Sequence, residues 1–191
     1  MSASTQGNGS LQMARIATDM GEIVVELRPD VAPRSVTAFV AAAKAGRYDG
    51  GQFCRIVRRD NDNGSPIIEV IQGVCNSTEA VKADLEVEPT SATGLCHCDG
   101  AISLPRMDGG PGTALGFFIC IGEQPALDAG GGRTADGLGF TAFGHVVEGM
   151  EIVRAVHALP TKLEAPDPFL KGQIPVEPPA ILSIRIDGAD Q

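Results

Sequence analysis

The chain has 191 residues, with 15 Lys and Arg against 24 Asp and Glu, which gives a formal net charge of -9 and a pI near 4.7. This acidic balance argues against a protein that binds nucleic acid or an anionic membrane through a broad basic surface. Apolar residues make up 43% of the chain, an ordinary globular composition, yet no stretch reaches the roughly 20 apolar residues that span a bilayer. We therefore expect a soluble protein, in which 24 glycines and 13 prolines favour many turns over a helical bundle.

The five cysteines are an odd number, which does not suit the framework of a secreted, disulfide-rich protein. The first twelve residues are polar and lack the apolar segment of a secretory signal. We expect a cytoplasmic protein with free thiols, in which residues 1–12 form a disordered tail and residues 13–191 form one domain.

The first predicted elements are a hairpin and a helix. Residues 14–28 alternate apolar and polar side chains on either side of Asp19-Met20-Gly21, which predicts two paired strands. Pro33 suits the first turn of a helix, apolar residues follow at helical spacing, and Gly46 is a good stop signal.

The rest of the chain consists mostly of short strand-like runs separated by turns. A second short helix is predicted over residues 149–158, a flexible loop over 129–139 and a Pro-rich irregular segment over 163–179. Eight strands with only two helices predict a mainly β fold, a closed antiparallel barrel, in preference to a βαβ sheet. The six strands expected after the hairpin lie at residues 53–57, 67–72, 101–104, 117–121, 141–147 and 180–186.

Several common functional motifs are absent. Gly109-Gly110-Pro111-Gly112 lacks the Lys-Ser/Thr of a phosphate-binding loop, and no G-x-S-x-G nucleophile turn occurs. Cys96-His97-Cys98 offers ligand types that zinc prefers, but no second paired motif completes a set of four. Ordinary free thiols are the favoured interpretation, and a cysteine-based metal or redox site is a minor alternative.

A series of motifs in fixed order along residues 14–187 resembles the cyclophilins, a family of peptidyl-prolyl cis-trans isomerases. The loop 129–139, the Asn-rich insertion before Ile67 and the run Lys171-Gly172-Gln173-Ile174 resemble its bacterial branch. The resemblance implies an eight-stranded antiparallel barrel capped by two α-helices, without a cofactor or metal. It also implies a monomer whose partners are proline-containing peptides and unfolded proteins. The matching blocks are Gly21-Glu22-Ile23, Tyr48-Asp49-Gly50, Phe53-Cys54-Arg55-Ile56-Val57, Val70-Ile71-Gln72-Gly73, Gly100-Ala101-Ile102-Ser103-Leu104, Phe117-Phe118-Ile119, Leu127-Asp128 and Phe143-Gly144-His145-Val146.

The reaction implied by the resemblance needs few residues. Rotation about an X–Pro bond crosses a barrier of ~18–20 kcal/mol because it breaks the double-bond character of the amide. A guanidinium that bonds the nitrogen lone pair of the twisted amide acts more strongly in the transition state than in the ground state. By resemblance this group is the catalytic Arg55. Strand alternation places Arg55 on the same side as Phe53 and Val57, an apolar face.

The resemblance implies further binding roles at matching positions. Gln72 would orient Arg55 and hold the substrate backbone, and the backbone N–H and C=O of Arg106 would hold the extended peptide. The proline ring would contact the walls and floor of an apolar site, at Val70, Phe118, Leu127 and Phe140.

Other positions depart from the family pattern. Gly116 replaces a polar residue and would lose one substrate hydrogen bond, Glu69 alters the floor of the proline site, and Ala126 replaces an aromatic residue. Cys54 adjoins Arg55, where a cation lowers the pKa of a thiol, so a thiolate there could compete for the guanidinium. Two interpretations stay open: an active isomerase, or a catalytically weak module or chaperone that only binds proline segments.

Overall fold

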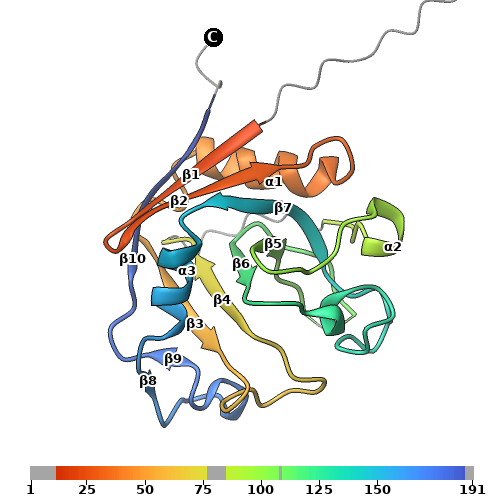
Figure 1. Ribbon diagram of the computed structural model, residues 1–191. Coiled ribbons are helices and arrows are strands. Elements are labelled where there is room, and N and C mark those ends of the chain that lie inside the picture. Colours follow the sequence, from red (N-terminus) through yellow and green to blue (C-terminus); the bar gives the residue numbers. More distant parts are fainter. Residues whose placement is uncertain (1–11, 77–84, 108, 188–191) are drawn as a thin grey trace, which may run out of the picture.

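The computed structural model describes residues 12–76, 85–107 and 109–187. Eight strands close into an antiparallel barrel in the order β1-β10-β3-β4-β6-β5-β7-β2 (Figure 1). The predicted eight-stranded barrel is therefore confirmed. The predicted tail lies outside the described residues, except for Gln12, which begins the first strand. The barrel strands are β1 (Gln12–Thr18), β2 (Gly21–Leu27), β3 (Gly51–Val57), β4 (Val70–Val74), β5 (Ala101–Leu104), β6 (Gly116–Cys120), β7 (Thr141–Glu148) and β10 (Ala180–Ile186).

The predicted strand over 67–72 begins three residues later than expected, as β4. Its early residues do not join the ladder because side chains already accept hydrogen bonds from their backbone. The N–H of Ile68 donates to Asp62 Oδ2 at 2.8 Å, and the N–H of Glu69 donates to Gln124 Oε1 at 3.0 Å. A backbone donor used in this way cannot also pair with a neighbouring strand.

The described residues contain one α-helix more than predicted. The expected helices are α1 (Pro33–Lys44) and α3 (Met150–His157), and α2 (Thr90–Thr93) is a single additional turn that ends at Gly94 with a φ of 72°. The N-terminus of α1 has no side-chain cap of its own. Instead, Glu88 accepts hydrogen bonds from the N–H groups of Arg34 and Ser35 at 3.0 and 2.9 Å, which satisfies two open donors. No helix in the described part of the chain is long and apolar enough to cross a membrane.

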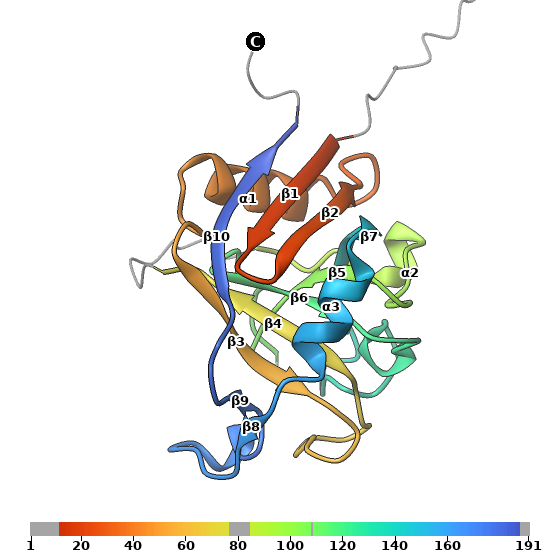
Figure 2. The same cartoon turned by 60° about the vertical axis from the view of Figure 1, so that its left-hand side comes forward.

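The predicted irregular segment 163–179 contains some regular structure. Two of its residues form the strand β9 (Ile174–Pro175), which pairs with β8 (Thr161–Lys162), just before the segment, in a separate antiparallel sheet. Residues 163–173 between them, here called the β8–β9 excursion, include a 3-10 turn over Pro168–Leu170. Figures 1 and 2 show the excursion at the opposite end of the molecule from α1.

Apolar side chains form two separate buried clusters. The larger one fills the barrel, where the Phe117 ring contacts Phe39, Tyr48 and Phe53 at centroid distances of 6.0, 5.8 and 6.1 Å. Both α1 and α3 contribute residues to this cluster, so a helix closes the barrel on two sides. The smaller cluster includes Phe118, the neighbour of Phe117 in β6. Successive strand residues face opposite sides of a sheet, so the smaller cluster lies outside the barrel.

His97 is a buried polar residue beneath this outer cluster. Its Nδ1 lies 2.7 Å from Asp128 Oδ1, its Nε2 lies 3.0 Å from the Ser103 hydroxyl, and its ring stacks on Phe118. Both ring nitrogens are therefore engaged by Asp128 and Ser103. All five cysteines are unpaired, and the described residues contain no group of three His, Cys, Asp or Glu arranged to hold a metal.

The buried imidazole predicts an acid-sensitive fold. Burial lowers the pKa of His97, although the bond to Asp128 opposes this effect. The unfolded chain therefore binds a proton more readily, and the free energy of unfolding should fall as the pH drops below about 6.5. Urea denaturation between pH 7.5 and 5.5 should show a shallower fall in a His97→Gln variant. Equal pH slopes in the two proteins would contradict this assignment.

Candidate functional site

Four strands place a row of polar and aromatic residues across the outer face of the barrel. Arg55 on β3 lies opposite Gln72 on β4, Gln72 lies opposite Phe118 on β6, and Phe118 lies opposite Ser103 on β5. Residues directly opposite each other in an antiparallel pair share a face of the sheet. The barrel register thus brings Arg55, Gln72 and Phe118, which are far apart in sequence, to one face.

A bulge at Cys54 determines which way Arg55 points. Phe53 pairs with Gly73 and Arg55 pairs with Gln72, so two steps along β3 match one step along β4. The extra residue reverses the alternation. Phe53 faces the barrel interior with Phe117, whereas Arg55 faces the outer side with Val57. The prediction that Arg55 shares a side with Phe53 was wrong for this reason, although its side does carry the outer apolar cluster.

The predicted proline-contacting residues gather in that outer cluster. Val70, Phe118 and Leu127 belong to it with exposures of 3%, 5% and 1%, and Phe140 packs against it as a partly exposed residue. The rings of Phe118 and Phe140 meet edge to face at 5.6 Å. The structure therefore brings these four residues together, with Phe140 as the member most open to solvent.

The Arg55 guanidinium is held by residues of the β8–β9 excursion. Its Nε donates to Gln173 Oε1 at 2.7 Å, and its central carbon lies 5.0 Å from the centre of the Phe169 ring. Burial lowers the pKa of Arg55, and the nearby Arg133 lowers it further. Even so, an arginine stays protonated at any pH that a fold tolerates. Among the described residues, Arg55 Nη2 is the one buried side-chain nitrogen or oxygen without a hydrogen-bond partner.

Gln72 does not make the contact that the resemblance implies. It lies beside Arg55 in the register, but no hydrogen bond links its side chain to the guanidinium among the described residues. Gln173 supplies that bond from a point 118 residues away in sequence. In the sequence Gln173 stands out only as part of the run 171–174 that resembles the bacterial branch, and nothing in its local pattern indicates a partner on β3.

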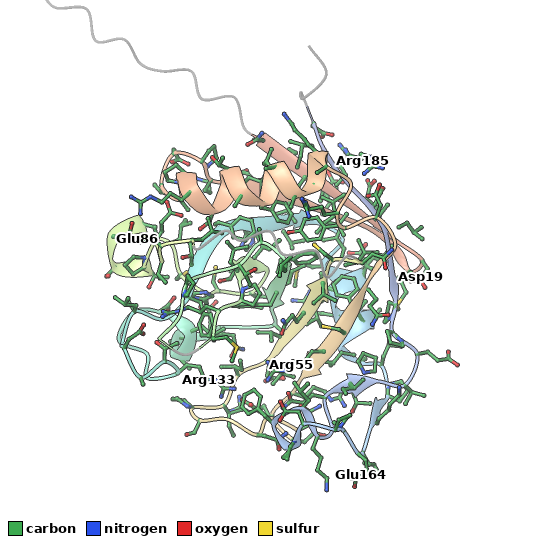
Figure 3. All side chains as sticks on the ribbon, turned by 180° about the vertical axis from the view of Figure 1, so that it is seen from behind. Asp19, Arg55, Glu86, Arg133, Glu164 and Arg185 are labelled. Carbon is green, nitrogen blue, oxygen red and sulfur yellow. The ribbon has the colours of Figure 1, made fainter. Side chains whose placement is uncertain are left out.

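Side-chain amides and one buried ion pair fasten three loops around Arg55. Asn63 Nδ2 donates to the carbonyls of Phe169 and Lys171 at 3.0 and 2.8 Å, which ties the Asn-rich loop, residues 60–66, to the β8–β9 excursion. Arg133 donates to both carboxylate oxygens of Asp62 at 2.9 Å, which ties the same loop to the Gly-rich loop 129–139. Figure 3 shows Arg55 and Arg133 in the same region of the molecule. The predicted flexible loop is therefore anchored at Arg133, whose side chain is only 7% exposed.

Arg106 links the turn after β5 to the loop that carries Phe140. Its side chain donates to the carbonyls of Gly110 and Gly139 at 2.8 and 2.9 Å and pairs with Asp136. Gly139 directly precedes Phe140, so this contact fixes one wall of the outer cluster. The backbone N–H and C=O of Arg106, which the resemblance assigns to substrate, have no hydrogen-bond partner among the described residues.

The departures from the family pattern have structural consequences. A Cβ on Gly116 would lie 2.7 Å from the Gly73 carbonyl oxygen, so the strands approach too closely for a side chain there. Burial raises the pKa of the Cys54 thiol, and this effect outweighs the opposing effect of Arg55. Arg55 does lower the pKa of this thiol, as expected, but the net pKa is raised because desolvation disfavours the thiolate more strongly.

Comparison with known proteins agrees with this geometry. Residues 13–185 match the family described as cyclophilin type peptidyl-prolyl cis-trans isomerase/CLD. The peptidyl-prolyl cis-trans isomerase cyp18 of Streptomyces antibioticus is 27% identical over 93% of this chain and 100% of its own length. A peptidyl-prolyl cis-trans isomerase-like 1 protein of Rhizopus delemar is 34% identical over 75% of this chain and 79% of its own.

Solved structures show the same fold. A cyclophilin-type peptidyl-prolyl cis-trans isomerase of Cryptosporidium parvum, crystallised in the presence of the dipeptide Ala-Pro, aligns with a TM-score of 0.68 at 21% identity. The alignment covers 91% of this chain and 98% of that one. Bacterial proteins are among the relatives, which gives modest support to the bacterial resemblance. The chain belongs to the cyclophilin family of peptidyl-prolyl cis-trans isomerases.

Proposed function

We propose that this peptidyl-prolyl cis-trans isomerase uses Arg55 to stabilise the twisted X–Pro amide of flexible or folding polypeptides. The observation that carries the proposal is the unpartnered Nη2 of a guanidinium whose Nε and ring face are already engaged. A buried donor without a partner is unfavourable, so a ligand that supplies an acceptor gains free energy at this atom.

The planar amide supplies that acceptor only when it rotates. The nitrogen lone pair of an X–Pro amide is delocalised into the carbonyl in both the cis and trans forms. When the bond twists, the lone pair localises on nitrogen and can accept a hydrogen bond from the guanidinium. An interaction made mainly in the transition state accelerates the reaction without excessive binding of the ground state.

We assign substrate binding to the residues around Arg55. The proline ring packs on the outer cluster at Val70, Phe118, Leu127 and Phe140, in keeping with the Ala-Pro dipeptide used with the Cryptosporidium parvum structure. Gln72 and the backbone of Arg106 hold the peptide chain on either side. No step of this reaction calls for a metal or an organic cofactor. The five unpaired cysteines suit a reducing compartment, so we propose the cytoplasm as the place of action.

A second candidate function is a proline-peptide binding module with weak catalysis. The closed surface around the site favours it, because Phe118, Val70 and Leu127 expose at most 5% and Gly116 cannot carry a substrate donor. Exchange spectroscopy by NMR on a short Ala-Pro peptide separates the two functions. Cross-peaks between cis and trans forms that grow with substoichiometric protein support the isomerase, whereas binding shifts without faster exchange support the module.

Removal of the guanidinium should abolish most of the rate enhancement. We expect Arg55→Ala to lower the protein-dependent exchange rate by a factor of about ten or more, since a charged hydrogen bond is worth roughly 1.5–3 kcal/mol. The circular dichroism spectrum should stay unchanged. Arg185→Ala is the matched control, because Arg185 lies far from Arg55 and pairs with Asp49 at the surface (Figure 3). An unchanged rate in Arg55→Ala would remove Arg55 from the mechanism.

The reaction should be nearly independent of pH between about 6 and 8. Arg55 stays charged, the amide does not titrate, and burial raises the pKa of Cys54 above the ordinary thiol value. The exchange rate per active protein should therefore form a flat profile in wild type and in Cys54→Ser. A single ionisation that disappears in Cys54→Ser would show that the thiol regulates Arg55, and a bell-shaped profile in both proteins would indicate general acid–base catalysis instead.

A further inference from the structure

Gln173 is a fully buried side chain that lies just before β9 and next to β3. Its backbone is bonded both to β3 and to the β8–β9 excursion. The Gln173 carbonyl accepts from the Ile56 N–H at 2.8 Å, and the Gln173 N–H donates to the Leu170 carbonyl at 3.0 Å. Ile56 directly follows Arg55 in β3. The position of Gln173 relative to Arg55 is therefore set by the main chain before any side-chain contact is counted.

The amide of Gln173 can adopt only one orientation. Its Nε2 donates to the Asn61 carbonyl at 2.7 Å, and its Oε1 accepts from Arg55 Nε at 2.7 Å. A carbonyl oxygen only accepts and an arginine Nε–H only donates, so a flipped amide would lose both bonds. Gln173 thus presents a fixed acceptor to one edge of the guanidinium.

Asn61, the residue that orients Gln173, is itself held on three sides. Its Nδ2 donates to the carbonyls of Ile56 and Gly172 at 3.1 and 2.8 Å, and its Oδ1 accepts from Arg58 N–H at 2.6 Å. These bonds join the Asn-rich loop, β3 and the β8–β9 excursion into one connected unit. Such a connected network restrains its members, since movement of one member breaks the bonds of the next.

Phe169 restrains the guanidinium perpendicular to its plane. The ring lies 5.0 Å from the central carbon, within the range of a cation–π contact. One edge of the guanidinium is therefore bound by Gln173 and one face is covered by Phe169, whereas Nη2 has no bond. Both restraints come from the β8–β9 excursion.

We infer that Gln173 is a positioning residue that aims the Nη side of Arg55 at the substrate, in place of the side-chain contact that Gln72 does not make. The inference rests on the proposed role of Arg55. A neutral amide suits this task because it bonds Nε without the strong attraction that a carboxylate would exert on the other guanidinium nitrogens. A carboxylate at the same place would attract two guanidinium nitrogens at once and would compete with the twisted amide for Nη2.

Two substitutions separate the effect of the amide hydrogen bonds from the effect of a charge at position 173. Gln173→Met keeps the length of the side chain and removes both amide bonds, so the guanidinium loses its fixed edge. Misplacement of a catalytic group lowers the rate of the chemical step, and kcat should fall about tenfold while KM for an Ala-Pro peptide changes less than about twofold. Gln173→Glu keeps an acceptor beside Nε but adds a charge, so it should lower kcat while Nε stays bonded.

The matched control is Gln124→Met. Gln124 is also a buried amide whose Oε1 and Nε2 bond backbone groups, at Glu69 and Ile121, and it makes no bond to Arg55. Both Met variants should lose comparable stability. Only Gln173→Met should shift the Arg55 Nε–H resonance in a ¹⁵N-edited NMR spectrum and speed its exchange with water.

The NMR signal keeps the inference testable in every outcome. Slow solvent exchange of Arg55 Nε–H in the wild-type protein is expected even if the variants fail to fold, and fast exchange there would overturn the inference. An unchanged kcat and an unchanged Arg55 signal in folded Gln173→Met would overturn it as well. If wild type does not accelerate isomerisation, the proposed function fails, but the response of the Arg55 signal to Gln173→Met still decides whether Gln173 positions the guanidinium.

Discussion

The site depends on the way in which a guanidinium is kept charged, oriented and partly unbonded inside the protein. Burial of a charge is unfavourable unless polar groups compensate, and the role proposed for Arg55 requires that at least one of its donors stays without a bond inside the protein. The structure meets both demands because different atoms of the guanidinium have different surroundings. Nε bonds the neutral amide of Gln173, the Phe169 ring covers one face, and Nη2 keeps its donor capacity. A carboxylate partner for Arg55 would satisfy the charge more completely, but it would occupy the donors that the proposed mechanism leaves for the substrate.

The barrel supplies the frame for this arrangement because it separates two apolar clusters. The interior cluster stabilises the fold, and the outer cluster at Phe118 lies on the same face of the barrel as Arg55. The bulge at Cys54 lets one strand contribute to both faces of the barrel, since it leaves Phe53 in the interior and turns Arg55 outward. His97 supports the outer cluster from below through its stack on Phe118. A regular strand in place of the bulge would have directed either Phe53 or Arg55 to the wrong face.

Local patterns in the sequence were sufficient to predict the barrel and both main helices, whereas the gathering of Val70, Phe118, Leu127 and Phe140 followed only from the resemblance to the cyclophilins. Alternation and turn residues indicate single strands and helices, because they depend on only a few neighbouring positions. The order of the family motifs indicates which distant residues share the site. The patterns did not reveal the bulge, because a bulge depends on how β3 pairs with β4. They also missed Gln173 and Phe169, whose contacts with Arg55 span more than a hundred residues of sequence. The late start of β4 has the same origin, since distant side chains take its first backbone donors.

The central claim is that Arg55 uses Nε for the protein and Nη for the substrate. The most direct test is a titration of the wild-type protein with an Ala-Pro peptide and, separately, with the matching Ala-Ala peptide, while the Arg55 guanidinium signals are followed by NMR. The account predicts that the Ala-Pro peptide perturbs the Nη resonances, that Nε–H keeps its position and slow exchange, and that Ala-Ala has little effect. Backbone shifts that show peptide binding without any response of the Nη resonances would contradict it.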